Sequence, residues 1–510
     1  MAAGASGRTL VPRVKSSPAE ADFGTSGPAP APRGSRGRGE RPAAFTRAFW
    51  TTPRLLRALT ALCLVTVLTT AAVAAAVLTG ARDGIDTVGH QAAPQAVRAA
   101  DLSFALSDMD AQAADLLLIG ADPDFAALRQ QTQTTYEQRR AQADADLQGA
   151  AEASANDPAG QRAVQSVFGE LGQYEALVAR AQLLEDQAKA PAGKPSADAL
   201  DAYRQATDLL RQQLLPAAGQ VTAANAATVD RVYAAQRGDL AAGWWWLLVT
   251  GVLALLALAV LQRTLAVRFR RVLNPPLAAV TLLLALALGY GLSLASRADQ
   301  HLVVAKSNAY DSVIALSQAR AVAYDMNADE SRYLIDPARA DSYEQSFLDK
   351  TQSIVRLKGA TLADYNTELA RAVDAHRASP AAVPFDGFLG EELRNITFPG
   401  EQAAADRALT TFQTYQVDDR RIRALRDQGR LKDAVTFDTG TAAGQSNADF
   451  DRFSQALGDV LGINQRAFDG AVAGADADLG TGTAAMGALA LAAALALITL
   501  GVRPRLREYR

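Results

Sequence analysis

Four long apolar runs without charged residues alternate with polar stretches along the chain. A helix needs about 20 apolar residues to cross a bilayer, and each run is close to that length. The pattern therefore predicts four transmembrane helices, the first of which starts near residue 55. The apolar runs occupy 58–80, 243–261, 277–295 and 482–502.

The polar stretch at 81–242 has the pattern of a helical bundle. Turn-forming residues cluster at Gly120-Ala-Asp-Pro123, Asn156-Asp-Pro158 and Pro191-Ala-Gly-Lys-Pro195. The segments between these clusters have helical spacing of apolar and small residues. We expect four helices there, at roughly 82–119, 124–155, 159–190 and 197–242.

The polar stretch at 296–481 repeats this scheme. Its first helix should stop near Asp336-Pro337, and a second should run to about His376. After a Pro-rich connection, a third helix is expected at about 401–428. The last helix should continue into the fourth span. It carries Asn464 on an otherwise apolar stripe, where a buried polar residue can set helix register.

These patterns predict an all-α membrane protein with four transmembrane helices and two extracytoplasmic four-helix-bundle-like domains. The two polar stretches also resemble a duplication. Ala105-Leu106-Ser107 and Ala315-Leu316-Ser317 follow the first and third spans at similar distances. An Asp-Pro break follows each of them.

Charge sets the expected orientation. The segment 1–57 holds ten Arg or Lys against three acids, and the link 262–276 holds four Arg and no acid. The tail 503–510 is also basic. Because basic short segments stay in the cytoplasm, we expect a multi-pass plasma-membrane protein with both termini inside. Residues 1–50 are rich in Ala, Gly, Pro, Ser and Arg, which favours a disordered basic cytoplasmic tail.

The sequence has no motif that indicates an enzyme. It lacks a Gly-rich phosphate loop, paired cysteines, HExxH and a serine elbow. The three histidines are scattered, and the single cysteine, Cys63, lies within the first span. We therefore expect no catalysis, no cofactor, no metal and no nucleic-acid partner. Uncharged spans also argue against a transporter.

A few charged positions are candidates for contact with a ligand or partner. Arg420, Arg421 and Arg423 follow two aspartates on the third helix of the second polar stretch. A solvated, salt-paired helix face is the simpler explanation, and capture of an anionic ligand or an acidic partner is the functional alternative. Arg332 and Tyr333, near the end of a helix, suggest the same contact role, because arginine binds carboxylates through two hydrogen bonds.

The layout resembles the GlnX-type membrane proteins of actinobacteria over about 50–510. Local similarities are Arg332-Tyr-Leu334, Gly429-Arg-Leu-Lys-Asp-Ala434 and Ser446-Asn-Ala-Asp-Phe450. That family is associated with a periplasmic amino-acid-binding lipoprotein, GlnH, and with protein kinase G, a soluble Ser/Thr kinase. The resemblance implies that the loaded binding protein docks outside and that the kinase contacts the inner segments.

The resulting functional hypothesis is a membrane sensor or signal relay without enzymatic activity. It would pass an amino-acid or binding-protein signal to a cytoplasmic effector such as a Ser/Thr kinase. Two alternatives remain open: a chemoreceptor-like protein that binds a small molecule directly, and a structural scaffold of the envelope or secretion machinery. A homodimer is expected only by analogy with other bundle receptors.

Overall fold

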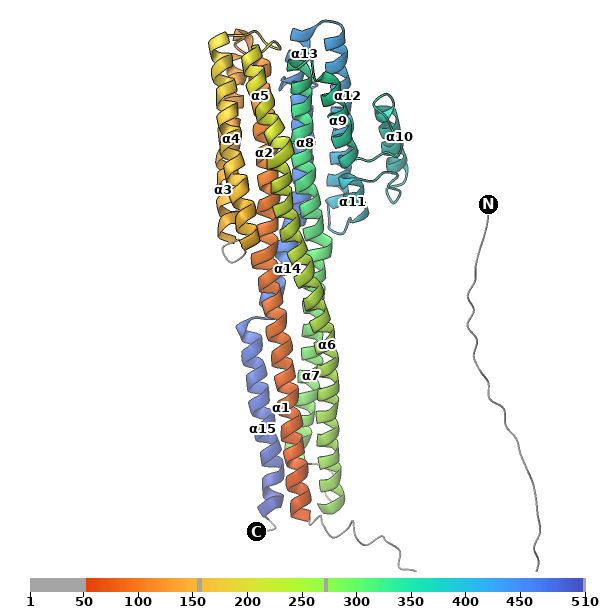
Figure 1. The fold of residues 1–510 in the computed structure, drawn as a ribbon. Helices are drawn as coiled ribbons and strands as arrows, with labels where there is room; N and C mark the ends of the chain where they lie inside the picture. The colour runs from red at the N-terminus through yellow and green to blue at the C-terminus, as the bar shows by residue number, and fades with distance from the viewer. Residues whose placement is uncertain (1–51, 154–157, 270–273, 508–510) are drawn as a thin grey trace, which may run out of the picture. The chain divides into compact units, whose positions relative to one another are not determined.

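The computed structural model describes residues 52–153, 158–269 and 274–507, and almost all of them are helical (Figure 1). The predicted disordered tail at 1–50 lies outside the described residues. The helices of the first half are α1 (Thr52–Ile85), η1 (Asp86–Ala92), α2 (Ala93–Ile119), η2 (Pro123–Phe125), α3 (Ala126–Ala153), α4 (Pro158–Ala188), α5 (Ala197–Leu209), η3 (Leu210–Leu214) and α6 (Leu215–Phe269).

The second half has the same general plan with more short helices. Within the described chain, extended backbone pairs only at an isolated bridge between Arg356 and Asp386. The prediction of an all-α membrane protein is therefore confirmed. The helices of this half are α7 (Pro275–Val303), η4 (Val304–Tyr310), α8 (Asp311–Ile335), α9 (Ala340–Ile354), α10 (Tyr365–Ala378), α11 (Phe388–Arg394), α12 (Glu401–Asp427), α13 (Leu431–Asp438), α14 (Ser446–Asp478) and α15 (Thr481–Arg507).

Four helical stretches are long and apolar enough to cross a membrane. They are Pro53–Ile119, Ala197–Arg268, Pro275–Ile335 and Ser446–Arg505. Large apolar side chains such as Leu62, Leu256, Leu286 and Leu489 are exposed on the predicted spans, as expected where lipid replaces water. The first three stretches pass from span to outer helix without a break in the helix. The fourth is interrupted at Leu479-Gly480, so α14 does not continue into α15 as the sequence predicted.

The helix predictions for the first half match the structure closely, but a further prediction for the second half, besides the continuity of α14 and α15, is wrong. The helix expected to run to about His376 ends at Ile354. Val355 is extended, with φ −131° and ψ 100°, and Gly359 has φ +80°. Both conformations break a helix, and the side chain of Gln352 bonds the loop backbone at Leu357 and Ala360. The chain becomes helical again at Tyr365.

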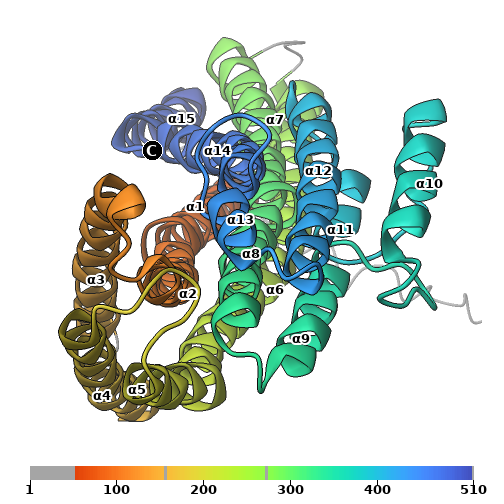
Figure 2. The same ribbon diagram turned by 90° about the horizontal axis from the view of Figure 1, so that it is seen from above.

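The two halves share one hydrophobic core at the end away from the spans. Leu102 and Leu117 of α2 belong to the same cluster as Leu334 of α8 and Phe437 of α13. Seen from above, α3, α4 and α5 flank α2 on one side, and α9 to α12 flank α8 on the other (Figure 2). The division into two outer domains stays a prediction, but the segments form one compact unit from Leu55 onward.

Each half carries a π-helical segment just beyond its first span. Segments η1 and η4 are each seven residues long and join α1 to α2 and α7 to α8. Such segments are rare and often occur near functional sites. Their matching positions agree with the duplication suggested by the sequence.

Candidate functional site

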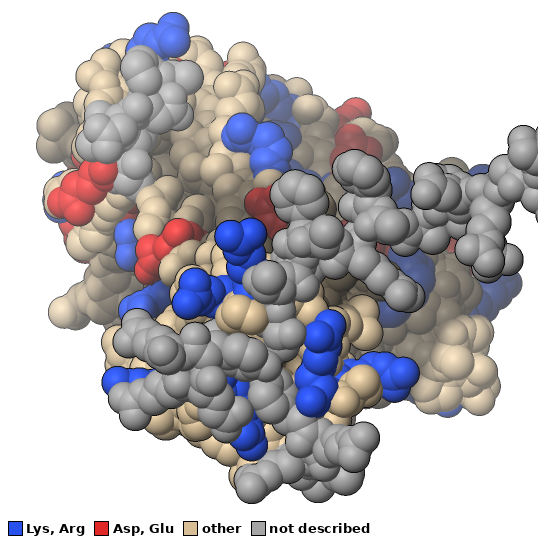
Figure 3. Space-filling model, turned by 90° about the horizontal axis from the view of Figure 1, so that it is seen from below, with Lys and Arg blue, Asp and Glu red and all other residues tan. Residues whose placement is uncertain are grey.

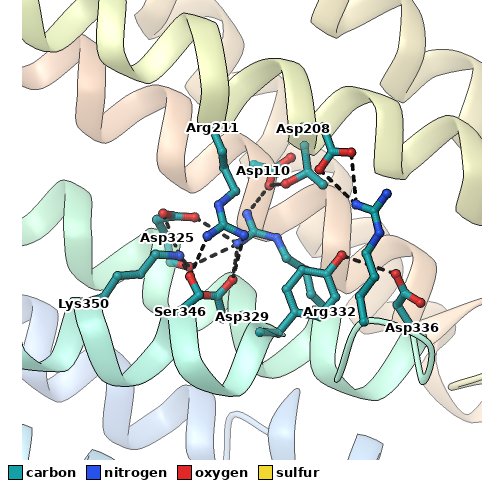
Figure 4. A network of polar contacts seen from close by, with 12 residues as sticks. Asp110, Asp208, Arg211, Asp325, Asp329, Arg332, Asp336, Ser346 and Lys350 are labelled. Atoms are coloured by element: carbon teal, nitrogen blue, oxygen red, sulfur yellow. Dashed lines mark hydrogen bonds and ion pairs between the residues drawn. The ribbon is translucent and has the colours of Figure 1, made fainter. Parts of the chain in front are cut away.

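Six charged side chains meet between the two halves, where α2 packs on α8. The pair α2 and α8 has the most extensive contact of any two described helices. The charged residues come from both halves, on α2, η3, α8 and α9, and their side chains point toward one another (Figure 4). We call them the Arg332 cluster: Asp110, Arg211, Asp325, Asp329, Arg332 and Lys350.

Arg332 is the centre of this cluster, and its side chain is completely enclosed. Its Nη1 donates to Asp329 Oδ1 at 2.5 Å and to Asp325 Oδ1 at 2.9 Å. Its Nη2 donates to Asp110, and its Nε donates to the Tyr203 hydroxyl at 3.2 Å. Every nitrogen of the guanidinium therefore has a partner, and two of those partners lie in the other half.

Asp110 receives hydrogen bonds from three side chains of the first half and from Arg332. Tyr174 of α4 donates to Asp110 Oδ1 at 3.0 Å, and Thr207 of α5 donates to Oδ2 at 2.9 Å. Tyr203 of α5 donates to the same carboxylate at 3.3 Å. This buried carboxylate thus joins α2, α4 and α5 to α8.

The other cations complete a balanced set of charges. Lys350 Nζ lies 2.6 Å from Asp325 Oδ2 and 2.5 Å from Asp329 Oδ2. Arg211 Nη1 is 3.9 Å from Asp329 Oδ1, and its Nη2 donates to Ser346 Oγ at 2.6 Å. Burial lowers the pKa of the Lys350 ammonium, although the two aspartates oppose that effect. Burial raises the pKa of Asp325, but Lys350 and Arg332 bring it below its usual value. Three positive groups therefore face three negative ones.

Further ion pairs join the halves around the cluster. Arg204 of α5 forms a two-point contact with Asp336, which caps the end of α8. Arg339 lies 2.9 Å from Asp208 Oδ1, and both side chains are about two-fifths exposed. At the distal end, Lys432 of α13 reaches Asp124 Oδ2 at 2.7 Å. Charge pairing therefore extends from the buried centre to the surface.

The structure brings together some of the residues that the sequence singled out. The Tyr333 ring lies between Arg423, whose guanidinium carbon is 4.4 Å from the ring centroid, and Arg426 at 4.1 Å. Arg423 is also held by Asp419 at 2.7 Å. This is a salt-paired face, but it is buried rather than solvated.

Arg420 and Arg421 are exposed and lie apart from that arrangement. Arg420 donates to the backbone of Ala363 at 3.2 Å, and Arg421 stacks over Phe437 at 4.2 Å. The contact role suggested for all five residues stays a prediction. In this conformation no ligand reaches Arg332 without separating α2 from α8.

The Arg332 cluster is suited to holding two helices in a fixed register rather than to chemistry. Its groups are paired with one another. The described residues also include no group of three or more His, Cys, Asp or Glu that could hold a metal ion. Removing one partner of a buried ion pair typically costs 3–5 kcal/mol, because the other charge is left uncompensated. Any displacement of α8 along α2 must therefore exchange or break these bonds together.

The sequence contains a signal for this cluster. Asp325, Asp329 and Arg332 stand at i, i+4 and i+7, on one face of the helix that carries the buried positions of α8. Asp110 likewise sits among buried alanines and leucines of α2. Opposite charges that recur on apolar helix faces in two segments indicate a buried ionic contact between them.

Comparisons with known proteins agree with a sensor role. Residues 84–234 match a family model described as an actinobacterial sensor domain. That segment runs from the end of α1 into α6 and includes Asp110, Tyr174, Tyr203 and Arg211. No curated protein and no solved structure matches the chain. The family match and the four candidate membrane helices together support an actinobacterial membrane sensor.

Proposed function

We propose that this membrane sensor relays an extracytoplasmic signal to a soluble cytoplasmic effector and has no enzymatic activity of its own. The effector would be a Ser/Thr kinase of the protein kinase G type. The signal would be an amino acid or an amino-acid-loaded binding lipoprotein, as the GlnX resemblance implies. The observation that carries the proposal is the charged contact between two outer helices that each continue into a membrane span.

Continuous helices supply the route for such a relay. Helix α2 leads through η1 into α1, and α8 leads back through η4 into α7. Both outer helices belong to the Arg332 cluster, through Asp110 and Arg332. A signal that changes how α2 packs on α8 therefore shifts α1 against α7, and such bistable elements are what coupling between distant sites requires.

A basic end on the spans supports the proposed orientation. Arg57 near the start of α1, Arg263 and Arg268 near the end of α6, and Arg503 near the end of α15 are exposed. Figure 3 views this end of the molecule, where Lys and Arg side chains gather. Basic segments favour the cytoplasmic side. They also offer a docking surface for an acidic face of a soluble protein.

Orientation is tested with single cysteines placed in a Cys63→Ala background. Gln130→Cys lies on the exposed face of α3, and Arg263→Cys lies at the basic end. A membrane-impermeant maleimide should label Gln130→Cys in intact cells and Arg263→Cys only after permeabilisation. The reverse pattern would overturn the proposed topology.

The relay is tested by crosslinked pull-down of the full-length protein from native membranes, with and without glutamate or aspartate. Recovery of a periplasmic binding protein and a cytoplasmic kinase, changed by the amino acid, would support the proposal. Arg332→Gln should abolish the change while the protein remains in the membrane. Arg407→Gln, an exposed arginine of α12 that belongs neither to the cluster nor to the candidate contact residues, serves as the matched control. Recovery of envelope or secretion components alone would contradict the relay and favour a scaffold.

A further inference from the structure

A groove of about 460 Å³ lies where α2, α8 and α14 meet. We call it the α2–α8–α14 groove. Asp101 of α2, Arg320 and Ser317 of α8, and Gly458 and Gln465 of α14 line it. Unlike the Arg332 cluster, it is open, since Asp101 and Arg320 are only partly buried. It is built by both halves, so an occupant touches each of them.

The groove presents two donors that nothing in the described chain satisfies. The Ser317 hydroxyl is buried, with the residue 1% exposed, and its Oγ has no hydrogen-bond partner among the described residues. The same holds for Arg320 Nε. Buried polar atoms are nearly always hydrogen-bonded, because an unpaired one loses its bonds to water without replacement. Two such atoms, one turn apart on α8 and lining the same groove, indicate an acceptor that is supplied from outside.

The Phe104 ring holds the Arg320 guanidinium in place. Its central carbon lies 4.0 Å from the centroid of the Phe104 ring, and that of Arg139 lies 4.8 Å from the same centroid. Arg139 is neutralised by Asp108, whereas Arg320 makes no direct salt bridge within the described chain. Stacking restrains a cation without using its hydrogen-bonding edge. Arg320 is therefore positioned but still available to an anion.

Asp101 adds a group of opposite charge at the same groove. Burial raises the pKa of its carboxyl, and the nearby Arg320 opposes this effect. Its side chain accepts no hydrogen bond from the described residues. A ligand whose acceptor atom bonds Arg320 also faces the Asp101 carboxylate, which is itself an acceptor. The ligand should therefore also carry a hydrogen-bond donor.

A second pocket of about 380 Å³ extends the groove toward the spans and shares Val97, Asp101 and Gln465 with it. Gly89 of η1 and Tyr310 at the end of η4 line this extension. Tyr310 is 2% exposed, and its hydroxyl is unpaired within the described chain. The groove thus ends beside the π-helical segments that join the outer helices to the spans.

We propose that the α2–α8–α14 groove binds a small organic carboxylate that also carries a hydrogen-bond donor. The carboxylate accepts hydrogen bonds from Arg320 Nε and Ser317 Oγ, and the donor faces Asp101. α-Amino acids and α-hydroxy acids share this chemistry. The inference deepens the proposed sensor function, because the ligand is taken directly by this chain rather than delivered only by a binding protein.

Such a ligand would act on both halves at once. Arg320 and Ser317 belong to α8 and Asp101 belongs to α2. The α14 side of the groove includes Gly458 and Gln465. Occupancy replaces unpaired donors with hydrogen bonds, which favours the arrangement that closes the three helices around the ligand. The change then begins next to η1 and η4, at the entrance to two of the spans.

The test measures binding to the purified full-length protein in detergent by calorimetry and by thermal shift. The probes are L-alanine, L-glutamate, L-lactate and succinate, with potassium chloride as the ionic control. We expect one or more of the first three to bind, and succinate, which lacks a donor, to bind at least tenfold more weakly. Amino acids and L-lactate separate the two ligand classes. If no probe binds, the proposal is overturned.

Two variants test the place of binding. Arg320→Gln removes the anchor. Gly458→Leu fills the groove, and a Cβ at Gly458 would meet no described atom within 4 Å, so the fold should accept it. Each should weaken binding at least tenfold. Gly470→Leu, on the same helix with the same free space but outside the groove, should bind as the unaltered protein does. If Arg320→Gln and Gly458→Leu bind the probes as tightly as Gly470→Leu does, the assignment of binding to this groove is overturned.

This test separates the groove from the relay. Binding to the purified protein needs no partner. If a probe binds as expected but the pull-down shows no effector, ligand binding in the groove is supported and the proposed relay is contradicted. If the effector responds to glutamate in membranes while no probe binds the purified protein, the relay is supported and the proposal of ligand binding in the groove is overturned.

Discussion

Arg332 of α8 and Asp110 of α2 form an ion pair in which both side chains are fully enclosed. They lie in different halves of the chain, and each also bonds to other residues of its own half. The pair therefore connects two hydrogen-bonded networks rather than two isolated side chains. The pair can form in only one register of α2 against α8, so breaking the pair and shifting the register go together.

Replacing Arg332 should strongly destabilise the outer unit. Arg332→Met leaves three aspartates near one another with only Lys350 and Arg211 to balance them. We expect a loss of about 3–5 kcal/mol in the free energy of unfolding, typical for removal of one partner from a buried pair. Denaturant titration of the solubilised protein, followed by circular dichroism, measures it. Arg420→Met should change the value by less than about 0.5 kcal/mol.

The exposed pair between Arg339 and Asp208 should contribute far less. Both side chains reach solvent, so the attraction is screened and their coupling should be about 0.2–1 kcal/mol. A double-mutant cycle with Asp208→Ala and Arg339→Ala measures it, at low and high salt. The coupling should fall as salt rises. A coupling as large as the loss in Arg332→Met would show that the halves are held mainly at their surface.

Glu392 should make stability depend on pH. It lies on α11 beside Glu401, and Asn464 donates to both carboxylates, at 3.2 Å and 2.7 Å. Burial raises the pKa of Glu392 from 4.5 to about 7, with Glu401 adding to the rise and Ser312 and Asn464 opposing it. The native state therefore holds a proton that the unfolded chain releases at lower pH.

Because the native pKa of Glu392 is raised, the stabilisation that its protonated carboxyl gives the native state is fully present below about pH 4.5. It disappears as the pH rises through about 7. Between pH 5 and pH 8 the free energy of unfolding should fall by at most about 3 kcal/mol from this group. Glu392→Gln should flatten the profile, since glutamine resembles the protonated acid. Glu391→Gln, at the exposed neighbouring position, should leave the slope unchanged. An identical slope in both variants would refute the assignment.

Close packing between two spans depends on Gly251. A Cβ at this position would lie 2.5 Å from Leu288 Cδ1 of α7. Gly251→Leu should force α6 away from α7 and cost about 1–3 kcal/mol, as overpacking does in tight interiors. The melting temperature in detergent reports the change. Gly289→Leu, where a Cβ meets no described atom within 4 Å, should melt like the parent protein.

Local patterns were enough to predict most of the helices. Apolar runs fixed the spans, and Asp-Pro breaks such as Asp122-Pro123 and Asp336-Pro337 fixed the distal turns, because both are short-range signals. The segment after Ile354 could not be read in this way. Its break comes from extended Val355 and from Gln352 bonding the loop backbone, and nothing in the spacing of apolar residues records these contacts.

The candidate site was harder to predict, because its partners come from distant parts of the chain. Arg332 was singled out, but as a ligand contact, since its partner Asp110 lies in the other half and on an apolar stripe. Asn464 was expected to set helix register. That role stays a prediction, and the structure adds that Asn464 donates to Glu392 and Glu401. Both cases required knowledge of how the halves pack, which one sequence without its tertiary contacts does not contain.

The interruption at Leu479-Gly480 has a consequence for how force travels. Three outer helices are rigidly continuous with their spans, so a twist or axial push applied outside is delivered directly to α1, α6 and α7. Helix α15 follows two residues that are not helical, so a twist of α14 does not reach it through an unbroken helix. It packs against α7 in the membrane region. We therefore expect α15 to follow the other spans through lateral contact, so that a movement outside reaches the basic end mainly through α1, α6 and α7.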